Sequence, residues 1–277
     1  MPLVIPTNVP SLDAQKTLTR NSNALAKSFA RLSSGFRINT AADDAAGLAV
    51  SESMKAQIRS YTMAERNANH AISMTQTAEA ALGEMHDILG RMRELSIQSA
   101  NGAMTAIDRG YLDTEFSALK DEMARIQGSS KFNGKLLVST AGEQITFQVG
   151  LNNTGSDQIT LTFGGLALTQ LLSASTNVAG ATAGTSLDAI GRIDSAIGII
   201  STERAKYGAA MNRLDVTVST IQTMRVNLSA ANSRIRDVDV AEETSQLSRS
   251  QVLSQAGVSV LAQANQLPQM AMALLQG

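Results

Sequence analysis

The sequence predicts a mainly α-helical protein: a long antiparallel, coiled-coil-like helical bundle that forms a rod, a small β-hairpin, and a terminal two-helix hairpin. Three observations lead to this fold class. Of the 277 residues 43% are hydrophobic but only 3% are aromatic, so the interior must consist of thin layers of aliphatic side chains. Apolar residues recur at three- and four-residue steps over long stretches in both halves of the chain. Between these stretches, two short segments alternate apolar and polar residues.

The amino-terminal half predicts two consecutive helices, over about residues 44–100 and 105–128. Asp43-Asp44 precedes the first helix, and we interpret this carboxylate pair as an N-terminal cap rather than as a general acid-base pair. Asn101-Gly102 ends that helix, and Thr105 with Asp108 forms a capping box for the second. The first helix has an apolar stripe at Leu48, Ile58, Tyr61, Ala68, Ile72, Leu82, Met85, Leu89, Met92 and Leu95.

Two glycines, Gly83 and Gly90, lie seven residues apart within the first helix. Each costs about 1 kcal/mol relative to alanine in a helix interior. Two interpretations are open: the glycines are simply tolerated, or they line a groove that another helix approaches closely.

The middle of the chain predicts a β-hairpin within about residues 135–165. Gln144–Val149 and Gln158–Phe163 each alternate apolar and polar residues, and an Asn/Gly-rich turn separates them. Residues 173–184 consist mostly of Ser, Thr, Ala and Gly, which predicts a short exposed loop.

A third long helix is predicted over about residues 186–235. Its start signal is Thr185, followed three residues later by Asp188, and its apolar positions continue in three- and four-residue steps to Ile235. The stripe is interrupted only at Arg204, Arg225 and Asn232. A continuous helix of this length would extend roughly 70 Å.

The two ends of the chain predict a terminal domain made of residues 1–43 and 237–277, while residues 44–236 form the rod domain. Residues 1–42 carry mostly basic charges and residues 237–277 mostly acidic ones, so we expect the ends to pair. Each end has one narrow apolar stripe and no core of its own, so both should order only against other chains. The predicted polymerisation residues are Leu18, Leu25, Phe29, Leu32, Phe36, Val258, Leu261, Leu267, Met270 and Leu274.

Several classes of function are excluded by what the sequence lacks. Without cysteine, there are neither disulfides nor thiolate metal sites. His70 and His86 are not at metal-ligand spacing and no nucleotide-binding or nucleophile motif occurs, so we predict no catalytic, metal or cofactor-binding residues and no enzyme activity. A net charge of -1 argues against nucleic acid as a partner. Polar residues interrupt the uncharged stretch 250–277, so membrane insertion is not expected, and the amino terminus lacks the pattern of a secretory signal.

Particular motifs resemble the bacterial flagellin family. Near the amino terminus they are Ile5–Leu12, Arg31–Asn39 and Asp43–Ala49; Phe132-Asn133-Gly134 follows the shorter helix, and Ala264–Gln269 with Leu274-Leu275 stands near the other end. The resemblance covers nearly the whole chain in order. It implies the flagellin arrangement of a terminal (D0) and a rod (D1) domain. Residues 173–184 stand where many relatives insert outer domains, so the chain resembles a short flagellin that lacks them.

The function implied by the resemblance is that of a structural subunit that polymerises into the extracellular bacterial flagellar filament for motility. The implied partners are further copies of the chain, the flagellar export chaperone and type III export apparatus, the filament cap protein and the hook-filament junction proteins. The terminal segments would be exported unfolded, without a cleaved signal peptide, and would order on assembly. The alternatives are a hook-filament junction protein, which shares export and terminal helices with flagellins, and a type III secreted effector.

The resemblance also implies a surface for innate immune recognition. Leu89–Gln98 resembles the flagellin segment recognised by the animal Toll-like receptor, and Glu115 stands at the matching position of the shorter helix. By this match Arg91, Leu95 and Glu115 would form the receptor patch. In the alternative interpretation Leu95 packs in the core, while Arg91 and Glu115 make contacts between rods in the filament; the two roles can coexist.

Overall fold

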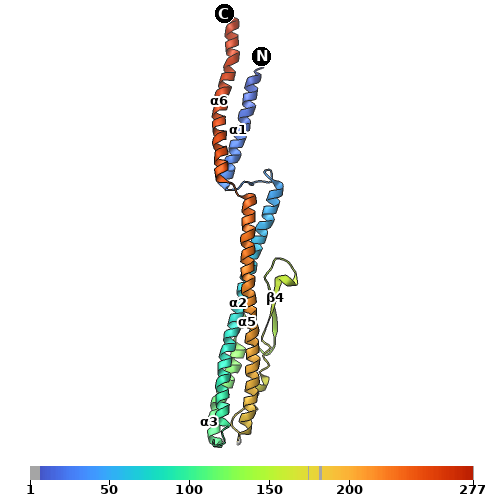
Figure 1. Ribbon diagram of the computed structural model, residues 1–277, viewed down its shortest axis with the longest axis vertical. Helices are drawn as coiled ribbons and strands as arrows, with labels where there is room; N and C mark the ends of the chain where they lie inside the picture. Colours follow the sequence, from blue (N-terminus) through green and yellow to red (C-terminus); the bar gives the residue numbers. More distant parts are fainter. Residues whose placement is uncertain (1–6, 174, 181–182, 277) are drawn as a thin grey trace. The chain divides into compact units, whose positions relative to one another are not determined.

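The computed structural model describes the backbone of residues 7–173, 175–180 and 183–276, and the side chains in these ranges other than 169–170 and 267–276. As predicted, the fold is mainly helical with a small antiparallel strand pair (Figure 1). The helices are α1 (Val9–Ser34), α2 (Ala45–Ser99), α3 (Ala106–Ser129), α4 (Thr169–Leu172), α5 (Gly184–Arg236) and α6 (Val240–Gln276), with a 3-10 turn η1 (Gly155–Asp157). The strands are β1 (Lys131–Phe132), β2 (Lys135–Leu136), β3 (Glu143–Gln148) and β4 (Gln158–Phe163).

The chain divides into two compact units. The terminal unit contains the chain up to Ile58 and from Val226 onward, and the central unit contains Arg59–Arg225. These boundaries fall inside α2 and α5, whereas the predicted domain limits, at 43/44 and 236/237, fall between helices. The predicted division into a terminal and a rod domain stays a prediction.

The core of the central unit consists of aliphatic and methionine side chains from α2, α3 and α5, with the β3–β4 hairpin packed against them. The hairpin has the predicted strands, with Glu143 opposite Phe163 and Gln148 opposite Gln158. Its Phe163 ring lies 5.6 Å from the ring of Tyr207, and burial raises the pKa of Tyr207 to about 12. The helix side chains at the centre of the core are Leu82, Met85, Leu89, Met92, Leu95, Phe116, Met123, Ile193, Ile200 and Tyr207.

The three polar residues that interrupt the apolar stripe of α5 are all bonded to α2. These three residues are half-buried, and in each case the partner stands on the facing helix. Arg204 donates to Glu79 Oε1 from Nε at 3.0 Å and from Nη2 at 2.7 Å, Arg225 Nη1 donates to Glu65 Oε2 at 2.5 Å, and in the terminal unit Ser51 Oγ donates to Asn232 Oδ1 at 2.7 Å.

The predicted caps of α2 and α3 are present, whereas α5 begins at a different residue from the one predicted. The capping box of α3 is present: Asp108 N donates to Thr105 Oγ1 at 3.2 Å, and Thr105 N donates to Asp108 Oδ2 at 3.0 Å. The Thr105 hydroxyl, followed by its backbone amide, lowers the pKa of Asp108. Before α2, Asp44 Oδ1 accepts from Gly47 N at 2.9 Å, which confirms the structural interpretation of this carboxylate. α5, however, begins at Gly184, before the predicted start at residue 186.

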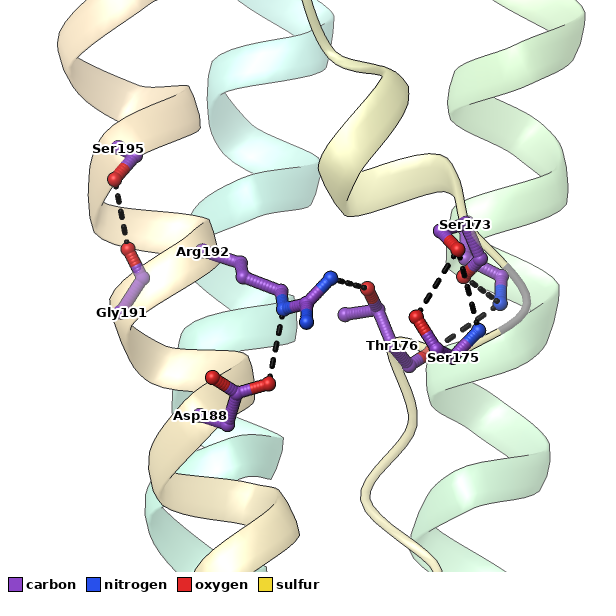
Figure 2. Close-up of polar contacts among 8 residues, drawn as sticks. Ser173, Ser175, Thr176, Asp188, Gly191, Arg192 and Ser195 are labelled. Atoms are coloured by element: carbon purple, nitrogen blue, oxygen red, sulfur yellow. Dashed lines mark hydrogen bonds and ion pairs between the residues drawn. The ribbon is translucent and has the colours of Figure 1, made fainter.

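The composition of the segment 173–184 predicts an exposed loop, but its described residues, 173, 175–180 and 183–184, are not all exposed. Residues 174, 181 and 182 lie outside the described residues. Thr176 and Val178 are buried, and the Val178 backbone donates to Asp113 Oδ1 at 2.8 Å and accepts from Ser99 Oγ at 2.8 Å. Figure 2 shows Arg192 directed at this segment, with Nη1 donating to the Thr176 hydroxyl at 3.3 Å. Local composition indicated a loop, but the anchoring partners come from α2, α3 and α5 and have no local signature.

The two glycines inside α2 have no other helix close to them in the described chain. A Cβ at Gly83 or Gly90 would meet no atom within 4 Å, so within the described chain no helix approaches them and the simpler interpretation holds.

β1 and β2 form a second hairpin that was not predicted, although its turn, Asn133-Gly134, is a strong hairpin signal. Both turn residues have positive φ, 47° and 80°.

Candidate assembly surface of the terminal helices

Helices α1 and α6 form an antiparallel pair within the terminal unit (Figure 1). Asn8 caps α1 by accepting from Ser11 N at 3.2 Å, and its Nδ2 donates to Ala264 O on α6 at 2.8 Å. At the other end of the pair, Arg31 Nη1 lies 3.5 Å from Glu243 Oε2. The two ends of the sequence therefore meet, with one ion pair of the predicted sign.

The side chains buried in the α1–α6 pair are small. Ser11, Ser28, Ser250 and Ala264 are the buried residues there. A Cβ added at Gly257 would lie 3.4 Å from Leu18 Cδ1, an ordinary van der Waals contact. Small residues let two helix backbones approach, but they remove little apolar area from water.

Large apolar side chains of the pair are left in solvent. Phe29 is 67% exposed and Val258 55% exposed, both being predicted polymerisation residues. The other predicted residues with described side chains, Leu18, Leu25, Leu32, Phe36 and Leu261, are half-buried, and the side chains of Leu267, Met270 and Leu274 lie outside the described residues. Sequence reasoning missed further exposed apolar residues, namely Val9, Leu12, Val240, Val252, Leu253 and Val260. The absence of charge from residues 250–277 was the signal that pointed to some of them.

Phe36 differs from the rest of its predicted stripe because it lies where two segments of the terminal unit cross. It forms an antiparallel bridge with Asp237, and the Arg236 guanidinium lies 4.4 Å from its ring centroid. Arg37 N donates to Arg236 O at 2.7 Å, and Arg236 Nη1 donates to Glu52 Oε1 at 2.6 Å. Phe36 therefore has a partner within its own chain.

The three candidate receptor residues divide between surface and core. Arg91 Nε donates to Glu115 Oε1 at 2.8 Å, which joins α2 to α3 at an exposed position. Arg91 Nη1 also donates to Glu94 Oε2 at 2.9 Å, and the bond to Glu115, followed by that to Glu94, raises the pKa of Arg91. Leu95, in contrast, is 1% exposed and belongs to the core of the central unit.

Metal sites and membrane-spanning helices can be checked in the described part of the chain. No group of three or more histidine or acidic side chains in it is placed to hold a metal ion. None of its helices combines the length and the hydropathy that crossing a membrane requires.

Comparison with known proteins places the chain in a family. The bacterial flagellin N-terminal helical region matches residues 5–142, and the bacterial flagellin C-terminal helical region matches residues 190–275. A flagellin of Halalkalibacterium halodurans is 41% identical over 274 residues, which cover 99% of this chain and 100% of that protein. The chain belongs to the bacterial flagellin family. Its length fits the short form of flagellin, without a variable outer domain.

Further relatives and solved structures are similar to this chain. A Bacillus subtilis flagellin is 40% identical over 97% of this chain and 98% of its own length, and a flagellar filament core protein of Brachyspira hyodysenteriae is 39% identical over 99% and 100%. Among solved structures, a Bacillus cereus flagellin has 36% identity and a TM-score of 0.48, covering 60% of this chain and 94% of its own. A putative flagellar hook-associated protein from Vibrio parahaemolyticus, with 14% identity, a TM-score of 0.60 and coverage of 70% and 100%, shares the fold alone. Flagellins are structural proteins of the flagellar filament.

Proposed function

We propose that this flagellin-family chain polymerises into the bacterial flagellar filament through its terminal helices and so serves motility. The observation that carries the proposal is the exposure of Phe29, Val258 and other large apolar side chains on a helix pair whose own contact is made of small residues. Water disfavours such a surface, and further copies of the chain would cover it. A head-to-tail contact that does not close into a ring then gives an open helical filament.

Truncation gives the broadest test of the proposal. Removing residues 250–277 should abolish filaments in electron micrographs while leaving the helical circular dichroism of the central unit, whose core lies within Arg59–Arg225. Normal filaments from the truncated chain would contradict the proposal. The full-length chain should sediment as long tubes, which neither a hook-filament junction protein nor a secreted effector would form.

Charge substitutions give a sharper test in the full-length chain. Phe29→Glu and Val258→Glu place a carboxylate where the proposed contact between chains requires apolar surface, so each should prevent sedimentable tubes while leaving the monomer helical. Gln255→Glu, at an exposed polar position of α6, is the matched control and should still polymerise. Equal polymerisation by all three variants would show that these apolar residues are not in the contact.

We also propose that the terminal segments order on assembly, after type III export in an unfolded form. In this proposal the export chaperone and export apparatus, the cap protein and the hook-filament junction proteins are the partners of successive stages. The small buried area of the α1–α6 pair supports the ordering step, because a helix pair with little apolar burial does not offset its conformational entropy. Amide hydrogen exchange measures this directly: in monomers α1 and α6 should exchange far faster than α2, and in filaments all three should be protected.

A second candidate function is recognition of the monomer by the animal Toll-like receptor for flagellin. The observation that favours it is the exposed contact between Arg91 and Glu115, residues of different helices that the resemblance places in one patch. Leu95 lies beneath this surface, so we propose that it supports the patch from the core. Recognition would be restricted to monomers if assembly covers the patch.

A receptor reporter assay with purified monomers tests this second function. Arg91→Ala and Glu115→Ala should each reduce signalling, since each removes an exposed polar group of the patch. Arg125→Ala is the matched control because Arg125 is also an exposed arginine, paired with Glu122 on α3 at 2.6 Å. Unchanged signalling by both patch variants would contradict the assignment.

A further inference from the structure

The turn between α2 and α3 holds an Asn-Gly pair in an unusual position. Asn101 and Gly102 are both exposed, just after the end of α2 at Ser99. Ala103 N donates to Asn101 Oδ1 at 3.1 Å, so the side chain curls over the backbone that follows it. The bond holds the Asn101 side chain against the backbone of the turn, next to the residue that follows it.

Gly102 is exposed to solvent. Glycine has no side chain to shield its own amide, and a Cβ added at Gly102 would meet no atom within 4 Å. The hydrogen bond that Asn101 Oδ1 accepts also draws electron density from Cγ, which makes that carbon a better electrophile. The pair thus combines an accessible nucleophile with an activated carbonyl.

We propose that Asn101 is a site of spontaneous deamidation in the folded protein. The Gly102 nitrogen attacks Asn101 Cγ, a Cγ–N bond forms, and the Cγ–Nδ2 bond breaks. The side-chain nitrogen leaves as ammonia, taking up the proton that the Gly102 amide loses. Water then opens the cyclic imide at either carbonyl to give aspartate or isoaspartate, so the net reaction exchanges one ammonia for one water.

The second Asn-Gly pair of the chain, Asn133-Gly134, is held in a conformation that opposes the same reaction. Ring closure requires Cβ and the following nitrogen to lie on the same side of the Cα–C bond. Asn133 has a φ of 47°, in the left-handed region, where ψ of about +30 to +60° puts the two atoms on opposite sides. The β1–β2 pairing fixes this turn, so Asn133 must open the hairpin before it reacts.

Deamidation at Asn101 would place a new negative charge beside a buried cation. Arg109 is 4% exposed, and its Nη2 donates to Asn101 O at 3.2 Å while its Nε donates to Ser99 O at 2.9 Å. Both of these acceptors are neutral carbonyls. The aspartate product keeps the backbone intact, and in the isoaspartate product the carbonyl that faces Arg109 becomes the free carboxylate.

Peptide mass spectrometry of the full-length protein, incubated in mildly alkaline buffer, tests the proposal. In the native protein Asn101 should convert at least about tenfold faster than Asn133, which corresponds to about 1.4 kcal/mol between their barriers. In denaturing urea the rates should converge, because both sites then have the same Asn-Gly chemistry. A native ratio below this value, or a ratio that persists in urea, would overturn the proposal.

A variant isolates the role of the glycine. Gly102→Ala adds a methyl group in open space and should slow conversion at Asn101 while leaving Asn133 unchanged. Circular dichroism verifies that the variant is folded, and the comparison of native and denatured wild-type protein stands independently of it. An unchanged rate at Asn101 in a folded Gly102→Ala variant would equally overturn the proposal.

Discussion

The core of the central unit and the α1–α6 pair differ in the size of the side chains that they bury. In the central unit large side chains such as Leu89 and Phe116 are fully buried, and α2, α3, α5 and a hairpin surround them. In the α1–α6 pair the buried residues are small, and large ones such as Phe29 stay in solvent. Large apolar side chains therefore complete a core in the central unit and stay exposed to solvent in the α1–α6 pair.

Under the proposed function, this difference lets one chain be stable before assembly and still require it. A unit with a complete core keeps its fold as a monomer, and a unit with an exposed apolar face gains its stability when other copies cover that face. Truncating a large apolar side chain should then lower the stability of the monomer when the residue lies in the central unit. The same truncation should weaken polymerisation when the residue lies in the terminal unit.

The largest expected effect comes from truncating a phenylalanine in each unit. Phe116→Ala should lower the free energy of unfolding of the monomer by about 3–5 kcal/mol, because it leaves a cavity in a closed core. Phe29→Ala should change it by less than about 0.5 kcal/mol and should instead raise the concentration needed for polymerisation. Urea unfolding measures the first quantity and sedimentation the second. A large loss of monomer stability in Phe29→Ala would break the comparison.

A smaller effect is expected from the buried phenol of the central unit. Because burial raises the pKa of Tyr207 to about 12, above the value of about 10 in an unfolded chain, the folded state holds its proton more tightly. Its stabilising contribution is complete below about pH 10 and is lost as the pH rises toward 12. Urea unfolding at a series of alkaline pH values should show this loss, and Tyr207→Phe should remove it. Tyr111→Phe, at an exposed tyrosine of α3, should leave the pH dependence unchanged.

Replacing a helix glycine by alanine should distinguish the two units by about 1 kcal/mol in the free energy of unfolding of the monomer. Gly90→Ala should raise monomer stability by about that amount, since helix propensity improves and the new methyl meets nothing within 4 Å. Gly257→Ala improves α6 equally but should not change global unfolding if α6 frays in the monomer. Thermal unfolding of both variants measures the two changes in stability. Equal increases would show that α6 unfolds cooperatively with the rest of the monomer.

The smallest effect concerns the ion pairs. A double-mutant cycle on Arg204 and Glu79 in the central unit should give a coupling energy of about 0.2–1 kcal/mol, as is usual for partly exposed pairs. The same cycle on Arg31 and Glu243 should give no measurable coupling in monomers. A coupling of equal size in both pairs would mean that the terminal helices are already ordered before assembly.

The sequence predicts elements better than it predicts their partners. Three- and four-residue periodicity located α2, α3 and α5 closely, and alternation located β3 and β4, because these signals are local. In the sequence, Arg204 and Asn232 appear only as polar breaks in an apolar stripe. Their hydrogen-bond partners, Glu79 and Ser51, could not be predicted because they lie on a helix far away in the sequence. Thr176 and Val178 were expected to be exposed for the same reason.

The candidate surface was predictable only in part. Periodicity identifies an apolar face but not what covers it, so it could not distinguish Leu95, which the core covers, from Phe29, which nothing in the described chain covers. The resemblance placed Arg91 and Glu115 in one candidate patch, but neither it nor any local pattern predicted the ion pair between them.

The crossing at Phe36 and Asp237 has a mechanical consequence. Main-chain bonds run in both directions there, from Arg37 N to Arg236 O and from Val238 N to Gly35 O at 3.1 Å, so the two connecting segments form one short ribbon. A single strand rotates freely about its bonds, but a cross-linked pair resists twisting. If the chain polymerises into a filament that is rotated from its base, torque on α1 and α6 would be transmitted through this ribbon. Because the two segments are hydrogen-bonded to each other, they would twist together and could not rotate independently.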